Sequence, residues 1–188
     1  IGNRAFKDCY SLTKIQLPST LTSIGTSAFN NCNIKEAILQ NVEIISDSAF
    51  NSNPNLNRVT VGTQKADVGK SAFAECRNLS ELRVPKNTVF REESLLNCVN
   101  LQVSDFSEYN RFDRYAFGKQ WFNEQPAREP IYKEHIFLGY NDLPPVLSDV
   151  TIKDGTKIIA DNAFYLMSSL FRLKDVRLPD GIVTIGDN

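Results

Sequence analysis

The sequence contains a single histidine, His135, among its 188 residues, so metal sites that need paired histidines, such as HExxH, are excluded. It has no GxSxG, P-loop, GxGxxG or CxxC motif. Carboxylates are plentiful, but no spacing pairs two of them as a general acid and a general base. These absences argue against an enzyme, and we expect neither a cofactor nor a bound metal.

Long apolar runs and an excess of charge of one sign are also missing. A membrane-spanning helix needs roughly 20 consecutive apolar residues, and the apolar runs here are far shorter. The formal net charge is −1, which gives no general attraction to nucleic acid or to anionic membranes. We therefore expect no nucleic-acid partner and no direct membrane insertion of this segment.

What the sequence does contain is a repeat. The pair Ala-Phe occurs six times, and its phenylalanines are 23, 21, 23, 44 and 47 residues apart. The two long steps are close to twice the short ones, so each hides one degenerate copy, and a fixed period of this size is typical of stacked repeat proteins. We expect a single domain, residues 1–188, of about eight units that start near residues 1, 24, 45, 68, 90, 112, 132–136 and 159, with a ninth beginning at 185. The chain starts and ends in mid-pattern, so we expect a piece of a longer protein.

Each unit combines a strand with a turn. In "LTKIQLP" of the first unit, apolar and polar residues alternate at period two, which predicts a short strand with one buried face. Phe6 and Cys9 are three residues apart, as on one face of a helical turn. Polar residues that could cap this turn precede four of the Ala-Phe pairs: Asn3, Thr26, Asp47 and Asp161. One unit cannot fold alone, so we expect stacked units with parallel strands and right-handed crossovers.

These residues carry a family resemblance. Ile-Gly, Ala-Phe, Cys and Leu-Pro recur at their own offsets, and the unit resembles the BspA-like class of leucine-rich repeats, with the pattern LxxIxLPxxLxxIgxxAFxxC. The resemblance implies an α/β fold: a curved, right-handed leucine-rich-repeat solenoid with a parallel β-sheet on one side and short helical turns on the other.

The pattern is irregular over residues 118–146. A hidden copy could start at Ile136, or at Tyr132 with Ile136 and Phe137 in the Ala-Phe positions, or the segment could be a loop protruding from one unit. Aromatic residues often anchor interfaces, so we consider this segment a candidate for partner contact; the alternative is that its aromatics fill the core. The candidate residues are Trp121, Phe122, Tyr132, His135 and Tyr140.

The expected strands also present charged residues outward. Lys14, Glu36, Arg58 and Glu81 would alternate in sign across adjacent strands, and Arg83 lies in the second outward position. One interpretation is a charged binding face that includes Lys14, Arg58, Glu81 and Arg83. The other is that opposite charges side by side stabilise the stack.

The four cysteines, Cys9, Cys32, Cys76 and Cys98, occupy the same position of their units, where other units carry Asn53 and Gln120. We expect a ladder of small buried thiols; disulfides between neighbouring units are the alternative.

Function follows from the resemblance rather than from any motif. It implies a non-enzymatic protein–protein interaction module, of the adhesin-like kind found at the cell surface or outside the cell, with a host, extracellular-matrix or cell-surface protein as partner. The alternative is a structural spacer within a larger surface protein that has no ligand of its own.

Overall fold

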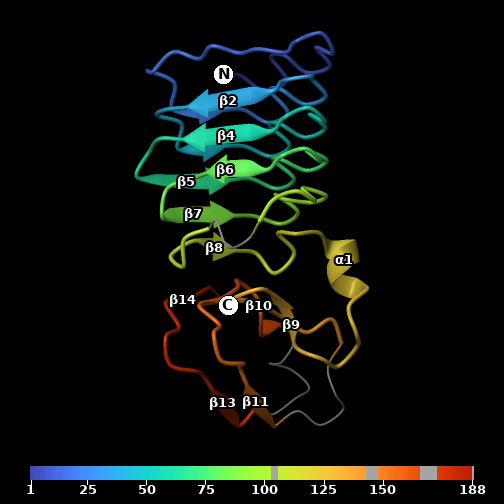
Figure 1. The fold of residues 1–188 in the computed structure, drawn as a ribbon, viewed down its shortest axis with the longest axis vertical. Coiled ribbons are helices and arrows are strands. Elements are labelled where there is room, and N and C mark those ends of the chain that lie inside the picture. The colour runs from blue at the N-terminus through green and yellow to red at the C-terminus, as the bar shows by residue number, and fades with distance from the viewer. Residues whose placement is uncertain (103–105, 143–147, 166–172, 188) are drawn as a thin grey trace.

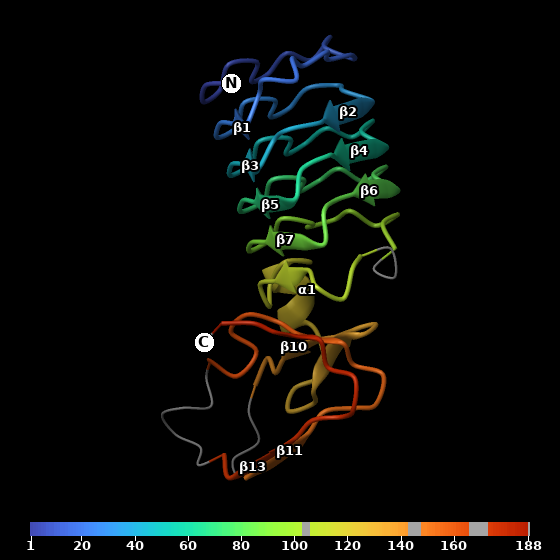
Figure 2. The ribbon, with the colours of Figure 1, turned by 90° about the vertical axis from the view of Figure 1, so that its left-hand side faces the viewer.

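A computed structural model describes residues 1–102, 106–142, 148–165 and 173–187. Two parallel sheets line opposite sides of a stack in its first part, residues 1–117, which we call the first block (Figures 1 and 2). The front sheet consists of β2 (Glu36–Leu39), β4 (Arg58–Val61) and β6 (Glu81–Arg83). The back sheet consists of β1 (Ser23–Ile24), β3 (Ile44–Ile45), β5 (Lys65–Val68), β7 (Asn87–Phe90) and β8 (Arg111–Phe112).

The front sheet contains three of the strands that the period-two pattern predicts, but the strand predicted for "LTKIQLP" is not formed, so Lys14 lies outside the sheet. Arg58 pairs in register with Glu36 on one side and Glu81 on the other, and Thr60 pairs with Arg83. Burial alternates along β2, with Ala37 and Leu39 inside. The expected outward positions are therefore confirmed for these strands, whereas Val103 and Asp105, the corresponding positions of the next unit, lie outside the described residues.

The back sheet was not expected. Its strands of two to four residues end on the apolar residue that opens each unit, such as Ile24 and Ile45. In the first block, consecutive units pair here in parallel from β1 to β8. Each unit therefore contributes hydrogen bonds to the stack on two sides.

The side expected to carry helical turns consists of hydrogen-bonded turns instead. The residue before five of the six Ala-Phe pairs is left-handed, as at Ser27 with φ of 55° and Ser71 with φ of 53°. A left-handed residue interrupts a helical turn, and it directs alternate N–H groups to the next unit. Phe29 N, for example, donates to Ala49 O at 2.8 Å. Bonds within the turn, such as that from Ala28 N to Gly25 O at 3.1 Å, alternate with these bonds between units, so the turns are present but do not continue as helices.

The Ala-Phe pairs form a column in the core. Phe29 stacks on Phe6 at 5.1 Å and on Phe50 at 5.3 Å, and Phe50 stacks on Phe73 at 5.6 Å. Ala28 beside this column is fully buried, as are its counterparts in the next two units. Aromatic rings stacked at this spacing gain more than their area burial alone provides.

The Ile-Gly motif has a steric cause that links neighbouring units. Asn3 Oδ1 accepts a hydrogen bond from Thr26 N of the next unit, and Asp47 Oδ1 likewise accepts one from Lys70 N, both at 2.9 Å. A Cβ at Gly69 would lie 2.7 Å from Asp47 Oδ1, so the residue that passes this carboxylate must be glycine. The prediction that Asn3, Asp47 and Asp161 cap the turns of their own units was therefore wrong, because their side chains accept bonds from the backbone of the following unit.

The back sheet ends at β8, and a second block, residues 131–187, follows the helix α1 (Lys119–Asn123) (Figure 1). Its strands are β9 (Ile131–Lys133), β10 (Ile136–Gly139), β11 (Asp149–Thr151), β12 (Ile158–Ile159), β13 (Asp175–Arg177) and β14 (Thr184–Ile185). The order of one sheet is β14-β12-β10-β9, and β11 pairs with β13. The blocks meet where Asp161 N donates to Phe112 O at 2.8 Å.

The irregular segment 118–146 thus contains α1 and a hairpin of β9 and β10, although its residues 143–147 lie outside the described part. β9 runs antiparallel to β10, which departs from the parallel rule of the repeat. Phe137 pairs with Ile159, the first residue of the expected eighth unit. This register lies one residue from the alternative that starts the hidden copy at Ile136.

Candidate partner-binding surface

On the front sheet, the charges bind one another. Arg58 lies 3.2 Å from Glu36 and 2.7 Å from Glu81, and Arg83 lies 2.6 Å from Glu81. The hydrogen bond from Arg58 lowers the pKa of Glu81, and the two glutamates raise the pKa of Arg58. Within the described residues, only Lys14 of the four candidate residues on this face makes no ion pair. This geometry favours charge pairing that stabilises the stack over a charged binding face.

The back sheet follows the same rule. Arg91 holds Asp67 through two hydrogen bonds of 3.0 and 2.6 Å, and Lys70 lies 2.8 Å from Glu92 in the adjacent unit. Lys65 lies 3.8 Å from Glu43. Paired charges of opposite sign cancel beyond a short distance, so neither long face of the first block presents a strong field to a partner.

Cations near the junction of the two blocks behave differently. Every cation–π contact among the described residues lies between residues 86 and 153. The Lys133 ammonium lies 5.3 Å from the ring centre of Trp121 and 5.8 Å from that of Phe117, and it forms no ion pair within the described residues. Such a contact contributes about 0.5–1 kcal/mol at an exposed site, so Lys133 remains available to an anionic group.

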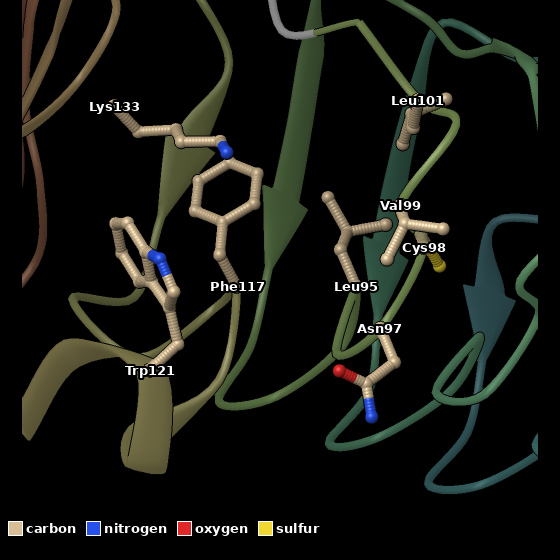
Figure 3. Close-up of a pocket in the computed structure, with 8 residues that line it drawn as sticks. All are labelled: Leu95, Asn97, Cys98, Val99, Leu101, Phe117, Trp121 and Lys133. Carbon is tan, nitrogen blue, oxygen red and sulfur yellow. The ribbon is translucent and has the colours of Figure 1, made fainter. Parts of the chain in front are cut away.

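Lys133 borders a hollow of about 270 Å³, the junction hollow (Figure 3). Phe117, Trp121 and Lys133 form one wall, and the turn that begins at Leu95 forms the facing wall. The complete lining is Leu95, Asn97, Cys98, Val99, Leu101, Phe117, Trp121 and Lys133.

The hollow exists because the chain leaves the repeat template after Phe117. Leu56 and Leu79 are fully buried, but their counterpart Leu101 is only partly buried. By count, Gln120 would stand in the cysteine position of its unit; instead it lies exposed on α1 and donates to Glu124 at 2.9 Å. The last regular unit of the first block is thus left partly without a covering neighbour.

The helix α1 sends its two adjacent aromatic residues to different sides. Phe122 is only 1% exposed and packs edge-on against Tyr115 at 5.1 Å, whereas Trp121 is partly exposed in the hollow. Adjacent residues on a helix point about 100° apart, so one turn cannot present both. Phe122 therefore occupies the core, as the alternative interpretation of these aromatics has it.

The other predicted residues are not gathered around Trp121. Tyr140 is only 7% exposed, and burial raises its pKa. Tyr132 is partly buried, its hydroxyl accepts a bond from Lys153 N at 3.1 Å, and burial raises its pKa as well. His135 lies in the β9–β10 turn and lines a separate hollow with Lys86, Tyr109 and Lys157.

Sequence reasoning missed most of the lining. Val99 is 71% exposed, at a position where three other units carry Asn33, Pro54 or Arg77. The first unit carries Tyr10 there, which is 65% exposed, so an alignment of the units does not single out Val99. The repeat pattern could not predict that Lys133 lines the hollow, because the position of Lys133 depends on the β9–β10 hairpin.

The cysteines are all free, and three of them are buried. Each buried thiol donates to the carbonyl of the phenylalanine one unit back, as Cys76 does to Phe50 O at 3.2 Å. Burial raises the pKa of Cys76 to about 12 and that of Cys98 well above its ordinary value. The expected thiol ladder is confirmed for Cys32, Cys76 and Cys98, while Cys9 is exposed.

Neither a metal cluster nor a spanning helix occurs in the part of the chain that the structure describes. No group of three or more His, Cys, Asp or Glu side chains could hold a metal ion there. None of the described helices is long and apolar enough to cross a membrane.

The comparisons with known proteins agree with this architecture. A family model described as "BspA type Leucine rich repeat region" matches residues 1–121 and 144–188 in six copies, and it leaves out most of the irregular segment. A leucine-rich repeat protein of Bacteroides ovatus is similar in structure, with a TM-score of 0.57 and 19% identity over 100% of this chain and 54% of that one.

A second leucine-rich repeat protein, from Eubacterium ventriosum, is matched with a TM-score of 0.27 and 17% identity over 82% of this chain and 50% of that one. This chain thus spans about half the length of these two proteins. No curated protein is matched. On the extent of the family match and the observed solenoid, the chain belongs to the BspA-type leucine-rich repeat family.

Proposed function

We propose that this chain is a non-enzymatic protein-binding module of a cell-surface or secreted protein, and that it contacts its partner at the junction hollow. The observation that carries the proposal is the combination of an exposed apolar residue, Val99, with a cation, Lys133, where the repeat is interrupted. Aromatic and apolar groups at the centre of such a patch supply most of the energy of a protein interface. Leucine-rich repeat proteins generally bind proteins, which supports the same conclusion.

The alternative function is a structural spacer. The self-paired charges on the front and back sheets favour it, because they stabilise the stack without offering a partner any net field. The two functions differ in one respect that can be measured: a spacer has no binding that depends on the hollow.

A displayed library of extracellular protein fragments, panned against the chain, tests the proposal. Val99→Asp changes a side chain that is 71% exposed, so it places a charge in the hollow without disturbing the core. Lys14→Ala, at an exposed lysine in the segment beside β2, is the matched control. We expect Val99→Asp to weaken the recovered binders at least tenfold and Lys14→Ala to leave them unchanged. Recovered binders whose affinity is unchanged by Val99→Asp, or the recovery of no binders, would contradict the proposal.

A further inference from the structure

The junction hollow has charge of one sign only. Of its eight lining residues, Lys133 alone is charged, and the remaining ones are Asn97, Cys98 and five apolar or aromatic residues. Glu75, which contacts the lining residue Asn97, is already occupied, since it accepts bonds from Asn97 at 2.6 Å and from Arg77 at 3.0 Å. Lys133 itself makes no ion pair among the described residues. No described carboxylate therefore competes for Lys133.

The cation–π contact of Lys133 with its two rings is weaker than the ion pair that an ammonium forms with a carboxylate. A ring face attracts a cation through its quadrupole, whereas a carboxylate adds a charge-assisted hydrogen bond that is roughly twice as strong as a neutral one. At 5.3 and 5.8 Å from the ring centres, the ammonium lies at the outer limit of the favourable range. A carboxylate can thus bind Lys133 without displacing it far.

The rest of the hollow suits one large apolar side chain. An engineered apolar cavity of about 150 Å³ is sufficient for benzene, and the hollow measures about 270 Å³. Its walls are apolar on both sides, Phe117 and Trp121 facing Leu95 and Val99 (Figure 3). Thr or Ser side chains would leave this surface in contact with water and gain little.

We propose that the partner is a protein segment in which an acidic residue stands within one or two positions of a large apolar residue, so that its carboxylate binds Lys133 while the apolar side chain enters the hollow. This inference rests on the proposed function and names the partner's chemistry. The acidic and apolar side chains of the partner segment make these contacts, and the front sheet does not contribute to the binding.

The single tryptophan makes the test direct, because all tryptophan fluorescence of the chain comes from Trp121 in the wall of the hollow. The probes are three capped, tryptophan-free tripeptide amides: acetyl-Glu-Leu-Leu, acetyl-Gln-Leu-Leu and acetyl-Glu-Ser-Ser. We expect acetyl-Glu-Leu-Leu to change the Trp121 emission at millimolar concentration, and each of the other two to bind at least tenfold more weakly. Raising the salt concentration should reduce the preference for Glu over Gln.

Two variants assign the effect to residues. Lys133→Met keeps a long side chain but removes the charge, so it should make the Glu and Gln peptides bind equally. Val99→Asp should abolish binding of the Glu peptide by like-charge repulsion, and Lys14→Ala should change nothing. A preference for Glu that survives in Lys133→Met, or equal binding of the Glu and Gln peptides to the unaltered chain, overturns the inference.

The outcomes also separate this inference from the proposed function. If displayed binders depend on Val99 but show no preference for acidic residues, the protein-binding function stands and the inference fails. If a sulfated disaccharide changes the Trp121 emission and none of the peptides does, the hollow selects an acidic sugar, and both fail.

Discussion

Asn53 is the residue by which the cysteine ladder can be tested most sharply. It is fully buried in the position that the cysteines occupy in other units. Its amide nitrogen donates to Phe29 O at 2.8 Å and to Phe50 O at 2.9 Å, and its Oδ1 accepts from Ile34 N at 3.2 Å. The bond to Phe29 O is the one that a thiol makes elsewhere, so Asn53→Cys restores part of the site and Asn53→Ala restores none of it.

The expected losses of unfolding free energy depend on which backbone groups lose their hydrogen-bond partner. Phe50 O also accepts a bond from the Cys76 thiol at 3.2 Å and stays satisfied in either variant. Asn53→Ala leaves Phe29 O and Ile34 N unpaired, at about 1–3 kcal/mol each, and should destabilise the fold by about 4 kcal/mol. Asn53→Cys leaves only the Ile34 N–H unpaired and should cost about 2 kcal/mol.

Urea unfolding, followed by both circular dichroism and Trp121 fluorescence, measures these differences. Repeat arrays can lose cooperativity, so the two probes must give coincident transitions before a free energy is assigned. Asn78→Ala, at an exposed asparagine, is the control and should stay within about 0.5 kcal/mol of the unaltered chain. The reasoning fails if Asn53→Ala is as stable as the control, or if Asn53→Cys is less stable than Asn53→Ala.

Two further predictions concern thiols and the junction. In native protein at pH 8, a thiol reagent should label Cys9 quickly and the three buried cysteines only after unfolding. The reason is that burial raises the pKa of Cys76 to about 12, which lowers its thiolate fraction about a thousandfold. Fast labelling of all four cysteines, counted by mass spectrometry, would contradict the buried ladder. Arg114→Lys should destabilise the chain by about 2–3 kcal/mol in the same urea assay. The buried Arg114 guanidinium donates to Asn162 O at 3.2 Å and to Tyr140 O, and an ammonium cannot reach both. A Lys variant as stable as the unaltered chain would mean that these bonds contribute nothing.

The parts of the fold that repeat were predictable, because each unit gives an independent observation of the same contact. The spacing of Ala-Phe pairs fixes which rings meet, and Phe29 does lie between Phe6 and Phe50. The alternation in the predicted strands likewise fixes the outward positions, so the pairing of Arg58 with Glu36 and Glu81 follows from the sequence.

The back sheet and the turns were not predictable from the same pattern. A strand as short as β1 or β3 contains at most one period of alternation, so the sequence pattern cannot predict it. The left-handed residues before the Ala-Phe pairs are Arg4, Ser27, Ser48, Ser71 and Asn162, and neither serine nor arginine has a strong preference for that conformation. Their φ angles are set by the hydrogen bonds to the next unit, which are tertiary contacts.

At the candidate site, the sequence located the segment but not its geometry. The loss of the repeat after residue 117 marked the region, and Trp121 does line the hollow there. The choice between Trp121 and Phe122 depended on the direction of α1, and the position of Lys133 depended on an antiparallel hairpin that the repeat does not contain. Both are set by packing between the blocks, for which a repeat pattern holds no information.

An interruption exposes apolar surface in a stack of this kind because regular stacking buries the surface between units. Continuation of the template past Phe117 would cover Leu101 as Leu79 is covered, and the hollow would vanish into the core. The chain turns into α1 instead, and Arg114 donates hydrogen bonds to the carbonyls of Asn162 and Tyr140 in the second block. The core therefore stays closed while one apolar wall remains open, so the same departure from the repeat that costs regular hydrogen bonds creates the surface at which we propose that a partner binds.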